Sequence, residues 1–296
     1  MRVGRSTVVS HTGRKRRHNE DAYVCEPPLF AIADGMGGAR AGEVASSLAA
    51  AALQTGEANG DGKERVAALI QAANHSVYER SSRDAEVAGM GTTMTVALVE
   101  DAGVTFGHVG DSRAYVLRDG VLEQLTDDHS LVAELVRGGK LSAEEAEHHP
   151  QRSVITRALG TDPDVDVDTF TVDPREGDVF VLCSDGLTDM VGDDEIGEVL
   201  GERRESLEEA AQELVRRANK AGGQDNITVI AFEITDEPAE PDEQTLEHTL
   251  EQTQPLPAAD GSPEPKKRRG WRRFVPLLVL IFAIAAAAIA LWVLAR

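Results

Sequence analysis

Apolar stretches of this sequence end repeatedly in a single aspartate next to a small residue. The stretches LFAIAD, VTFGHVGD and VFVLCSD end at Asp34, Asp111 and Asp185. A fourth aspartate, Asp225, directly precedes the apolar part of GGQDNITVIAF, so a strand running the opposite way would bring it to the same edge. A lone aspartate at a strand end is usually a turn former. Four in equivalent positions indicate instead that their carboxylates converge on one site.

Converging carboxylates repel one another unless positive charge lies between them. Of the basic residues, only Arg113 stands beside one of these aspartates in the sequence. Bound cations are the better explanation, and an all-oxygen site without His or Cys selects Mg²⁺ or Mn²⁺. A pair of such ions can share a nucleophilic hydroxide and hold a phosphoryl group for in-line attack. The glycines that follow Asp34 would let backbone carbonyls and water approach the ions.

The N-terminal stretch GRKRRHNEDAY adds further acids and bases. Glu20 and Asp21 come close behind a basic run that includes Arg16. A guanidinium group binds phosphate oxygens bidentately, so the stretch suits a site that holds both metal and phosphate. A solvated charged turn is the alternative interpretation.

The composition limits the class of protein. The chain has 296 residues and a net charge of −21, with 41% hydrophobic and 27% charged residues. Such acidity argues against nucleic acid as a partner, because phosphate backbones bind basic surfaces. Cys25 and Cys183 have no metal-site spacing and fit a reducing cytosol. The N-terminus lacks the apolar core of a signal peptide.

The C-terminal part divides into three segments after a folded domain, residues 1–235. Residues 236–265 hold nine acids, six prolines and no Lys or Arg, which predicts a disordered linker. Residues 266–273 are a basic cluster, and residues 274–295 are free of charge. As a helix, 274–295 would span roughly 33 Å, enough for a bilayer core of about 30 Å. We expect a single-pass cell-membrane protein with a cytoplasmic domain, since basic clusters flank spans on that side; a buried core helix is the alternative.

The predicted linker also contains a short near-repeat. Thr245, Thr249 and Thr253 each stand two residues after an acid. We hypothesise that a Ser/Thr kinase phosphorylates at least one of them; a plain solubilising spacer is the alternative.

Mixed helices and strands must position the candidate site. Apolar periodicity predicts helices over 42–56, 63–82, 130–139, 142–149 and 206–223. Strands are predicted over 6–13, 29–33, 91–100, 103–110, 113–120, 121–125, 178–186 and 226–234, with an Asp-Gly hairpin signal in RDGV. Because strands follow one another without regular alternation with helices, we expect antiparallel sheets covered by helices rather than a parallel Rossmann sheet.

Six short motifs together resemble one known family. They are RRHNED (16–21), DGMGG (34–38), GTT (91–93), GDSR (110–113), SDGL (184–187) and GQDNIT (223–228). Their types and order resemble the metal-dependent protein Ser/Thr phosphatases of the protein phosphatase 2C family, over roughly residues 6–234. With its basic cluster and apolar tail, the chain is similar to the bacterial membrane-anchored members that oppose Hanks-type Ser/Thr kinases.

The resemblance implies a fold and a reaction. The fold would be an α+β, αββα sandwich of two antiparallel sheets with a helix pair on each outer face, plus the C-terminal transmembrane helix. The reaction would be hydrolysis of phosphoserine and phosphothreonine in proteins by direct attack of a metal-bridging hydroxide. Its partners would be phosphorylated proteins, a membrane Ser/Thr kinase among them, and membrane lipid. It would reverse kinase signalling at the cytoplasmic face of the membrane.

The resemblance also implies roles for single residues. Two Mn²⁺ or Mg²⁺ ions and a weaker third are implied, held by Glu20, Asp21, Asp34, the Gly35 carbonyl, Asp111, Asp185 and Asp225. Asp34 would bridge the first two ions, Asp185 and Asp225 would bind the first, and Glu20 and Asp21 would serve the second, largely through water. Asp111 and Asp185 would share the third. Arg16, four residues before Glu20, would bind the substrate phosphate beside the catalytic Asp34 and Asp185.

The chain departs from animal members of the family at Met36, where they carry a histidine that is a candidate general acid. Methionine donates no proton, so a metal-bound water is the first candidate here, followed by His18 and His129. Residues 127–160 resemble the flap beside the family's active site. A catalytically silent phosphopeptide-binding module and a two-metal phosphodiesterase or nuclease are the alternatives, although the acids are all kept and no basic groove is evident.

Overall fold

The computed structural model describes residues 2–37, 41–56, 60 and 62–236. The chain divides into two units, Met1–Ala239 and Glu240–Arg296, and the described residues all belong to the first. Nearly all of the predicted linker with its threonines, the basic cluster and the predicted span 274–295 therefore lie outside the described residues. No helix within the described part of the chain is long and apolar enough to cross a membrane.

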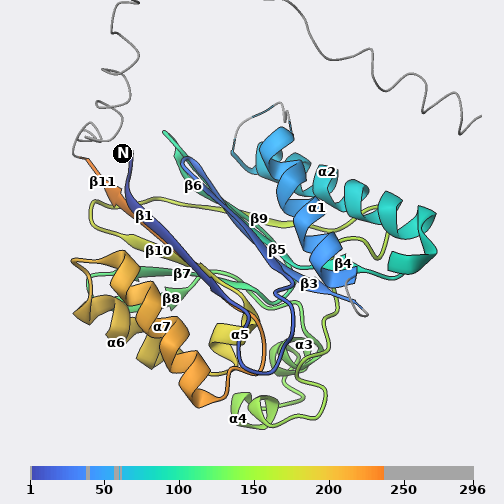
Figure 1. The fold of residues 1–296 in the computed structure, drawn as a ribbon. Helices are drawn as coiled ribbons and strands as arrows, with labels where there is room; N and C mark the ends of the chain where they lie inside the picture. Colours follow the sequence, from blue (N-terminus) through green and yellow to red (C-terminus); the bar gives the residue numbers. More distant parts are fainter. Residues whose placement is uncertain (1, 38–40, 57–59, 61, 237–296) are drawn as a thin grey trace, which may run out of the picture. The chain divides into compact units, whose positions relative to one another are not determined.

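Two antiparallel sheets lie face to face in the first unit (Figure 1). The first sheet has the order β1-β11-β10-β7-β8, with β1 Arg2–His11, β7 Arg113–Arg118, β8 Val121–Gln124, β10 Val179–Cys183 and β11 Ile227–Thr235. The second has the order β2-β3-β5-β6-β9, with β2 Asp21–Glu26, β3 Leu29–Met36, β5 Met94–Glu100, β6 Gly103–Val109 and β9 Asp168–Val172. The short strand β4, Gly91–Thr92, pairs with β3. The expected antiparallel arrangement is confirmed.

Aromatic side chains fill the space between the sheets. Phe30 of β3 stacks on Phe232 of β11 with ring centroids 4.1 Å apart. Phe106 of β6 lies 5.8 Å from Phe180 of β10. All four rings are fully buried, so this layer holds the two sheets together mainly by removing apolar surface from water.

Helix pairs cover the outer faces of the sandwich (Figure 1). Helices α1, Ala41–Thr55, and α2, Gly62–Arg83, cover the second sheet. Helices α6, Asp193–Glu202, and α7, Leu207–Ala221, cover the first. In α1 the inward positions include the fully buried Ala45 and Ala49, whose small side chains let the helix approach the sheet closely. This is the four-layer αββα sandwich that the family resemblance implies.

Short helices gather at one end of the sandwich (Figure 1). They are α3, Leu131–Arg137, α4, Ala143–Glu147, and α5, Asp185–Thr188. Helices α3 and α4 belong to the predicted flap, residues 127–160, and each begins at a serine whose side chain accepts a backbone N–H. A 3₁₀ turn, Ala85–Val87, follows α2.

Several elements differ from the sequence prediction. Strands β2 and β9 and helices α5 and α6 were not predicted, because β2 and β9 are edge strands with little apolar alternation and α6 is rich in acids. The predicted strand 91–100 is interrupted at Thr93, whose N–H donates to the Asp34 carbonyl at 2.8 Å. The predicted hairpin is present, and its Asp119 adopts a φ of 51°.

Candidate active site

Strand ends bring the predicted acids to one edge of the sandwich. Asp34, near the end of β3, is the register partner of Asp21, the first residue of β2. Asp185 follows β10, and Asp225 precedes β11, which runs antiparallel to β10. Asp111 follows β6, and its charge acts on both Asp34 and Asp185. The convergence inferred from the sequence is therefore present in the fold.

Mutual repulsion dominates the electrostatics of this edge. Burial raises the pKa of Asp34 well above its usual range, and the nearby charges of Asp21 and Asp185 raise it further. Burial likewise raises the pKa of Asp185, followed by the charges of Asp111 and Asp225. At neutral pH these carboxylates can all be ionised together only if cations lie among them.

The outer acids of the cluster are shifted in the same direction. Burial raises the pKa of Asp111 to about 7, and the charge of Asp128 adds to the rise. Burial raises the pKa of Asp21 to about 6, although hydrogen bonds from Thr228 and Ser184 oppose it. The pKa of Glu20 is raised by burial, against the opposing charge of Arg16.

Whether cations fit this edge can be judged from three of its carboxylate oxygens. Oδ1 of Asp21, Oδ1 of Asp111 and Oδ1 of Asp185 are buried and have no hydrogen-bond partner among the described residues. A buried acceptor left unpaired is costly, by about 1–3 kcal/mol or more for a charged group. Divalent cations, which accept lone pairs from carboxylate oxygens, would satisfy these three atoms. The oxygen-only donor set fits Mn²⁺ or Mg²⁺.

Side chains alone do not complete the ligand set. Across the described ranges, no group of three or more His, Cys, Asp or Glu side chains is arranged to hold a metal ion. The Gly35 carbonyl oxygen and the Glu20 carboxyl group both lie close to Gly42, since a Cβ on Gly42 would lie 2.7 Å from the oxygen and 3.0 Å from the carboxyl carbon.

Two glycines beside the aspartates lie directly against other backbone segments. A Cβ on Gly35 would lie 2.1 Å from the Gly42 carbonyl oxygen. A Cβ on Gly186 would lie 2.0 Å from the carbonyl oxygen of Asn226. Both positions therefore require glycine because another backbone segment packs directly against them. Access of carbonyls and water to ions beside Asp34 stays a prediction.

Arg16 lies among the acids, as predicted. Its Nη2 donates to Oδ2 of Asp225 at 2.6 Å, and its Nη1 lies 3.4 Å from Oε2 of Glu20. The side chain of Arg16 is half-exposed. A guanidinium group is therefore available at the rim of the acidic cluster.

Polar neighbours that the sequence analysis missed hold the acids in place. Oδ2 of Asp21 accepts from Thr228 Oγ1 at 2.6 Å and from Ser184 Oγ at 2.9 Å. Oδ1 of Asn226 accepts the Glu20 N–H at 2.7 Å. Each of these three lies within three residues of a predicted acid in the motifs SDGL and GQDNIT, which is the signal that would have found them.

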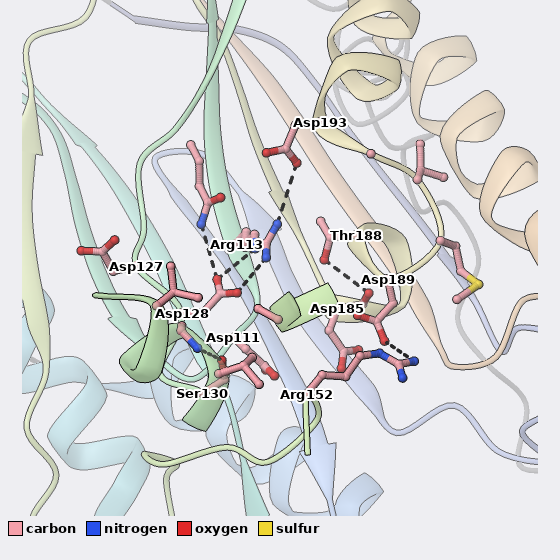
Figure 2. A pocket seen from close by; sticks show the side chains of 18 of the residues that line it. Asp111, Arg113, Asp127, Asp128, Ser130, Arg152, Asp185, Thr188, Asp189 and Asp193 are labelled. Carbon is pink, nitrogen blue, oxygen red and sulfur yellow. Dashed lines mark hydrogen bonds and ion pairs between the residues drawn. The ribbon is translucent and has the colours of Figure 1, made fainter. Parts of the chain in front are cut away.

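A cleft of about 970 Å³ opens beside the acids, between the flap and the α5–α6 segment (Figure 2). Asp111 and Asp185 are among the residues that line it. On the flap side, Arg152 lies 3.7 Å from Asp189, a residue that the sequence analysis did not single out. The charge of Asp189 raises the pKa of both Asp111 and Asp185. The cleft is therefore continuous with the acidic cluster.

Comparison with known proteins decides the family. A profile of the family described as protein phosphatase 2C matches residues 10–229. This chain belongs to the protein phosphatase 2C family. The serine/threonine phosphatase stp of Listeria monocytogenes serotype 4b is 43% identical over 238 residues, which are 75% of this chain and 92% of the relative.

Solved structures agree with the family. The crystal structure of the Mycobacterium tuberculosis serine/threonine phosphatase PstP/Ppp aligns with a TM-score of 0.74 and 40% identity, over 79% of this chain and 99% of that chain. A structure of the PstP catalytic domain in complex with two manganese ions aligns with a TM-score of 0.72 and 38% identity, over 80% and 100% of the two chains. The chain is a protein-serine/threonine phosphatase of the 2C type.

The surroundings of Met36, His129 and His18 bear on which of them could act as a general acid in this 2C phosphatase. Met36 pairs with Gly91 and offers no proton donor. His129 is buried, and both of its ring nitrogens have protein partners, so it cannot protonate a leaving group. His18 is exposed, close enough for its charge to act on Glu20.

Proposed function

We propose that this 2C phosphatase hydrolyses phosphoserine and phosphothreonine in proteins with the help of two divalent cations bound at the strand ends. The three buried, unpaired oxygens on Asp21, Asp111 and Asp185 carry this proposal. The two manganese ions of the PstP catalytic domain support it by similarity.

The ligands that we propose are those that the family resemblance implies. Asp34 is central, since four other aspartates act on its charge. We assign Asp185 and Asp225 to one ion, and Glu20, Asp21 and the Gly35 carbonyl to the second. Asp111 with Asp185 would hold a weaker third ion, and the charge of Asp189 favours a cation there.

When bound, the ions would supply a hydroxide nucleophile at neutral pH and neutralise charge on the phosphoryl oxygens. The protein's own residues then orient the substrate. Once Asp225 and Glu20 hold cations, the Arg16 guanidinium is free to bind phosphate oxygens bidentately. Thr228 and Ser184 fix the orientation of Asp21. Partial burial of Asp34 and Asp185 reduces the screening of these charges by bulk water.

We further propose that the enzyme acts at the cytoplasmic face of the cell membrane and reverses the action of a membrane Ser/Thr kinase. The support is the sequence alone: an uncharged stretch, 274–295, next to the basic cluster 266–273. Recovery of the full-length chain from the soluble fraction after carbonate extraction would contradict this anchoring.

Phosphate release from a phosphothreonine peptide tests the reaction. We expect release with Mn²⁺ and none with excess chelator, together with a rise in melting temperature when Mn²⁺ is added. Tight peptide binding without release would indicate a silent binding module. Cleavage of DNA or cyclic nucleotides to nucleotide monophosphates, without phosphate release from the peptide, would indicate a phosphodiesterase or nuclease.

A further inference from the structure

His129 stands at the base of the flap and contacts Gly110 through both its backbone and its ring. Only 3% of His129 is exposed. Its N–H donates to the Gly110 carbonyl at 2.7 Å, and the Gly110 N–H donates to the ring Nδ1 at 3.1 Å. Gly110 directly precedes Asp111. The flap is therefore bonded twice to the residue next to a proposed metal ligand.

The Gly110 contact fixes the tautomer of the ring. An amide N–H can only donate, so Nδ1 carries the lone pair and Nε2 carries the proton. Nε2 lies 3.2 Å from Oδ2 of Asp168 in β9 and donates to it, and Nη1 of Arg157 lies 3.1 Å from the same ring nitrogen. Oδ1 of Asp168 accepts from Arg157 Nη1 at 2.6 Å. One imidazole thus links the loop before Asp111 to the second sheet.

The same residue joins the two ends of the flap. The Thr156 N–H donates to the His129 carbonyl at 2.8 Å. Ser130 forms an isolated β-bridge with Ile155. By contrast, helix α3 contains no buried residue among those described. The helical part of the flap is thus anchored at its base more than by its own packing.

We propose that His129 is a positioning residue that fixes the flap relative to Asp111. It would keep the flap side of the cleft in a constant position beside the acids at the strand ends. This inference rests on the proposed function in one respect, that the polypeptide around the phosphorylated residue lies in the cleft. Because the ring bonds Gly110 on one side and Asp168 on the other, its loss would release the flap wall while the strand-borne acids keep their places. Binding of a polypeptide would weaken more than binding of a small phosphate ester.

Two amide substitutions separate the two ring contacts. In His129→Asn the side-chain oxygen can take the place of Nδ1 and accept from Gly110, but nothing reaches Asp168. In His129→Gln the amide nitrogen can take the place of Nε2 and donate to Asp168, but the acceptor for Gly110 is lost. His129→Ala removes both. His75→Asn on the outer face of α2, where the side chain is 67% exposed, is the matched control.

The measurement compares substrates of two sizes with the full-length enzyme at saturating Mn²⁺. For His129→Ala we expect KM for a phosphothreonine peptide to rise about tenfold, as for one or two lost hydrogen bonds. KM for p-nitrophenyl phosphate should change much less. The Asn and Gln variants should lie between Ala and wild type, and His75→Asn should match wild type. Hydrogen exchange should speed up in residues 130–155 but not in β5.

Equal losses on both substrates with unchanged exchange in the flap would overturn the proposal. So would a wild-type KM for the peptide in His129→Ala, or in the Asn and Gln variants if the Ala variant does not fold. Wild-type enzyme that releases phosphate from neither substrate with Mn²⁺ would refute the proposed function itself, a different result from a missing difference between substrates.

Discussion

The floor of the active site and the flap beside it are built in opposite ways. The floor is the edge of strand ends that carries Asp34, Asp111, Asp185 and Asp225, whose side chains are buried or partly buried. Glycines let backbone segments pack closely within it. The flap, residues 127–160, carries helices with exposed or partly exposed side chains and is held by bonds at its base. The contrast implies that chemistry is assigned to the rigid part of the fold and substrate access to the part of lower local stability.

The largest effect on activity is expected when an acid of the floor loses its charge. Asp185→Asn and Asp34→Asn should lower kcat by more than tenfold, a barrier change above about 1.4 kcal/mol. The metal-free variants should stay folded, because each substitution removes a repelling charge from the cluster. Steady-state kinetics and thermal melting check both points, with the exposed Asp101→Asn as control. A kcat within tenfold of wild type would show that the ligand assignment is wrong.

Glycine substitutions separate floor from flap by packing. Gly186→Ala would place a Cβ 2.0 Å from the Asn226 carbonyl oxygen, so we expect a loss of about 3 kcal/mol in the free energy of unfolding. Gly139→Ala in the flap meets no atom within 4 Å but has a φ of +66°, so about 1 kcal/mol is expected. Denaturant titration measures both values. Equal losses in the free energy of unfolding at the two positions would contradict the difference in packing between floor and flap.

The floor should also respond to pH when it holds no metal. Folding raises the pKa of Asp21 to about 6 and of Asp111 to about 7, both above the ordinary value of 3.8. Their contribution to stability is therefore present at low pH and is lost as pH rises through 6 to 7. We expect the melting temperature of the chelator-treated enzyme to fall by about 5 °C between pH 5 and pH 8.

Added Mn²⁺ should reverse that fall at pH 8, since the cation replaces the lost protons. Asp111→Asn should flatten the same profile. A metal-free melting temperature that rises from pH 5 to pH 8 would contradict the electrostatics described for the floor.

The smallest effect is expected at the rim of the flap. Arg152 and Asp189 lie 3.7 Å apart with about half of each side chain exposed, so Arg152→Ala should change the free energy of unfolding by less than about 1 kcal/mol. Arg113→Ala should lower the free energy of unfolding more than Arg152→Ala does. Arg113 binds both carboxylate oxygens of Asp128 at 2.9 and 2.8 Å, and this pair is more buried. A larger loss for Arg152→Ala would mean that the flap is anchored at its rim as well.

The sequence predicted the floor better than the flap, for a physical reason. An apolar strand that ends in an acid carries its own signal, and antiparallel pairing then forces Asp185 and Asp225 together. The hydroxyls that orient Asp21 were missed because Ser and Thr at strand ends have many ordinary uses. Acids on elements that the sequence did not predict, such as Asp189 after α5, lie in no periodic pattern that would indicate a place at the site.

The flap contacts were beyond sequence reasoning because they join residues far apart in the chain. His129 meets Gly110 and Asp168, which are 19 and 39 residues away. Whether a histidine is a buried bridge or a proton donor depends on those neighbours, and the sequence alone left both open for His129. Antiparallel sheets covered by helices, by contrast, follow from local strand and helix patterns, and the family resemblance implied the αββα order of layers.

The pairing of β1 with β11 determines where a tag, a surface or a fused partner can be attached to the domain. Arg2 is the register partner of Thr235, so the start of the domain and its last described strand lie together at one end (Figure 1). Ile227, next to the acidic edge, begins the same strand, and its nine residues separate the two ends by roughly 30 Å. A tag, a surface linkage or a fused partner attached at either place would therefore pull on the end opposite the chemistry and leave the approach to the substrate cleft open.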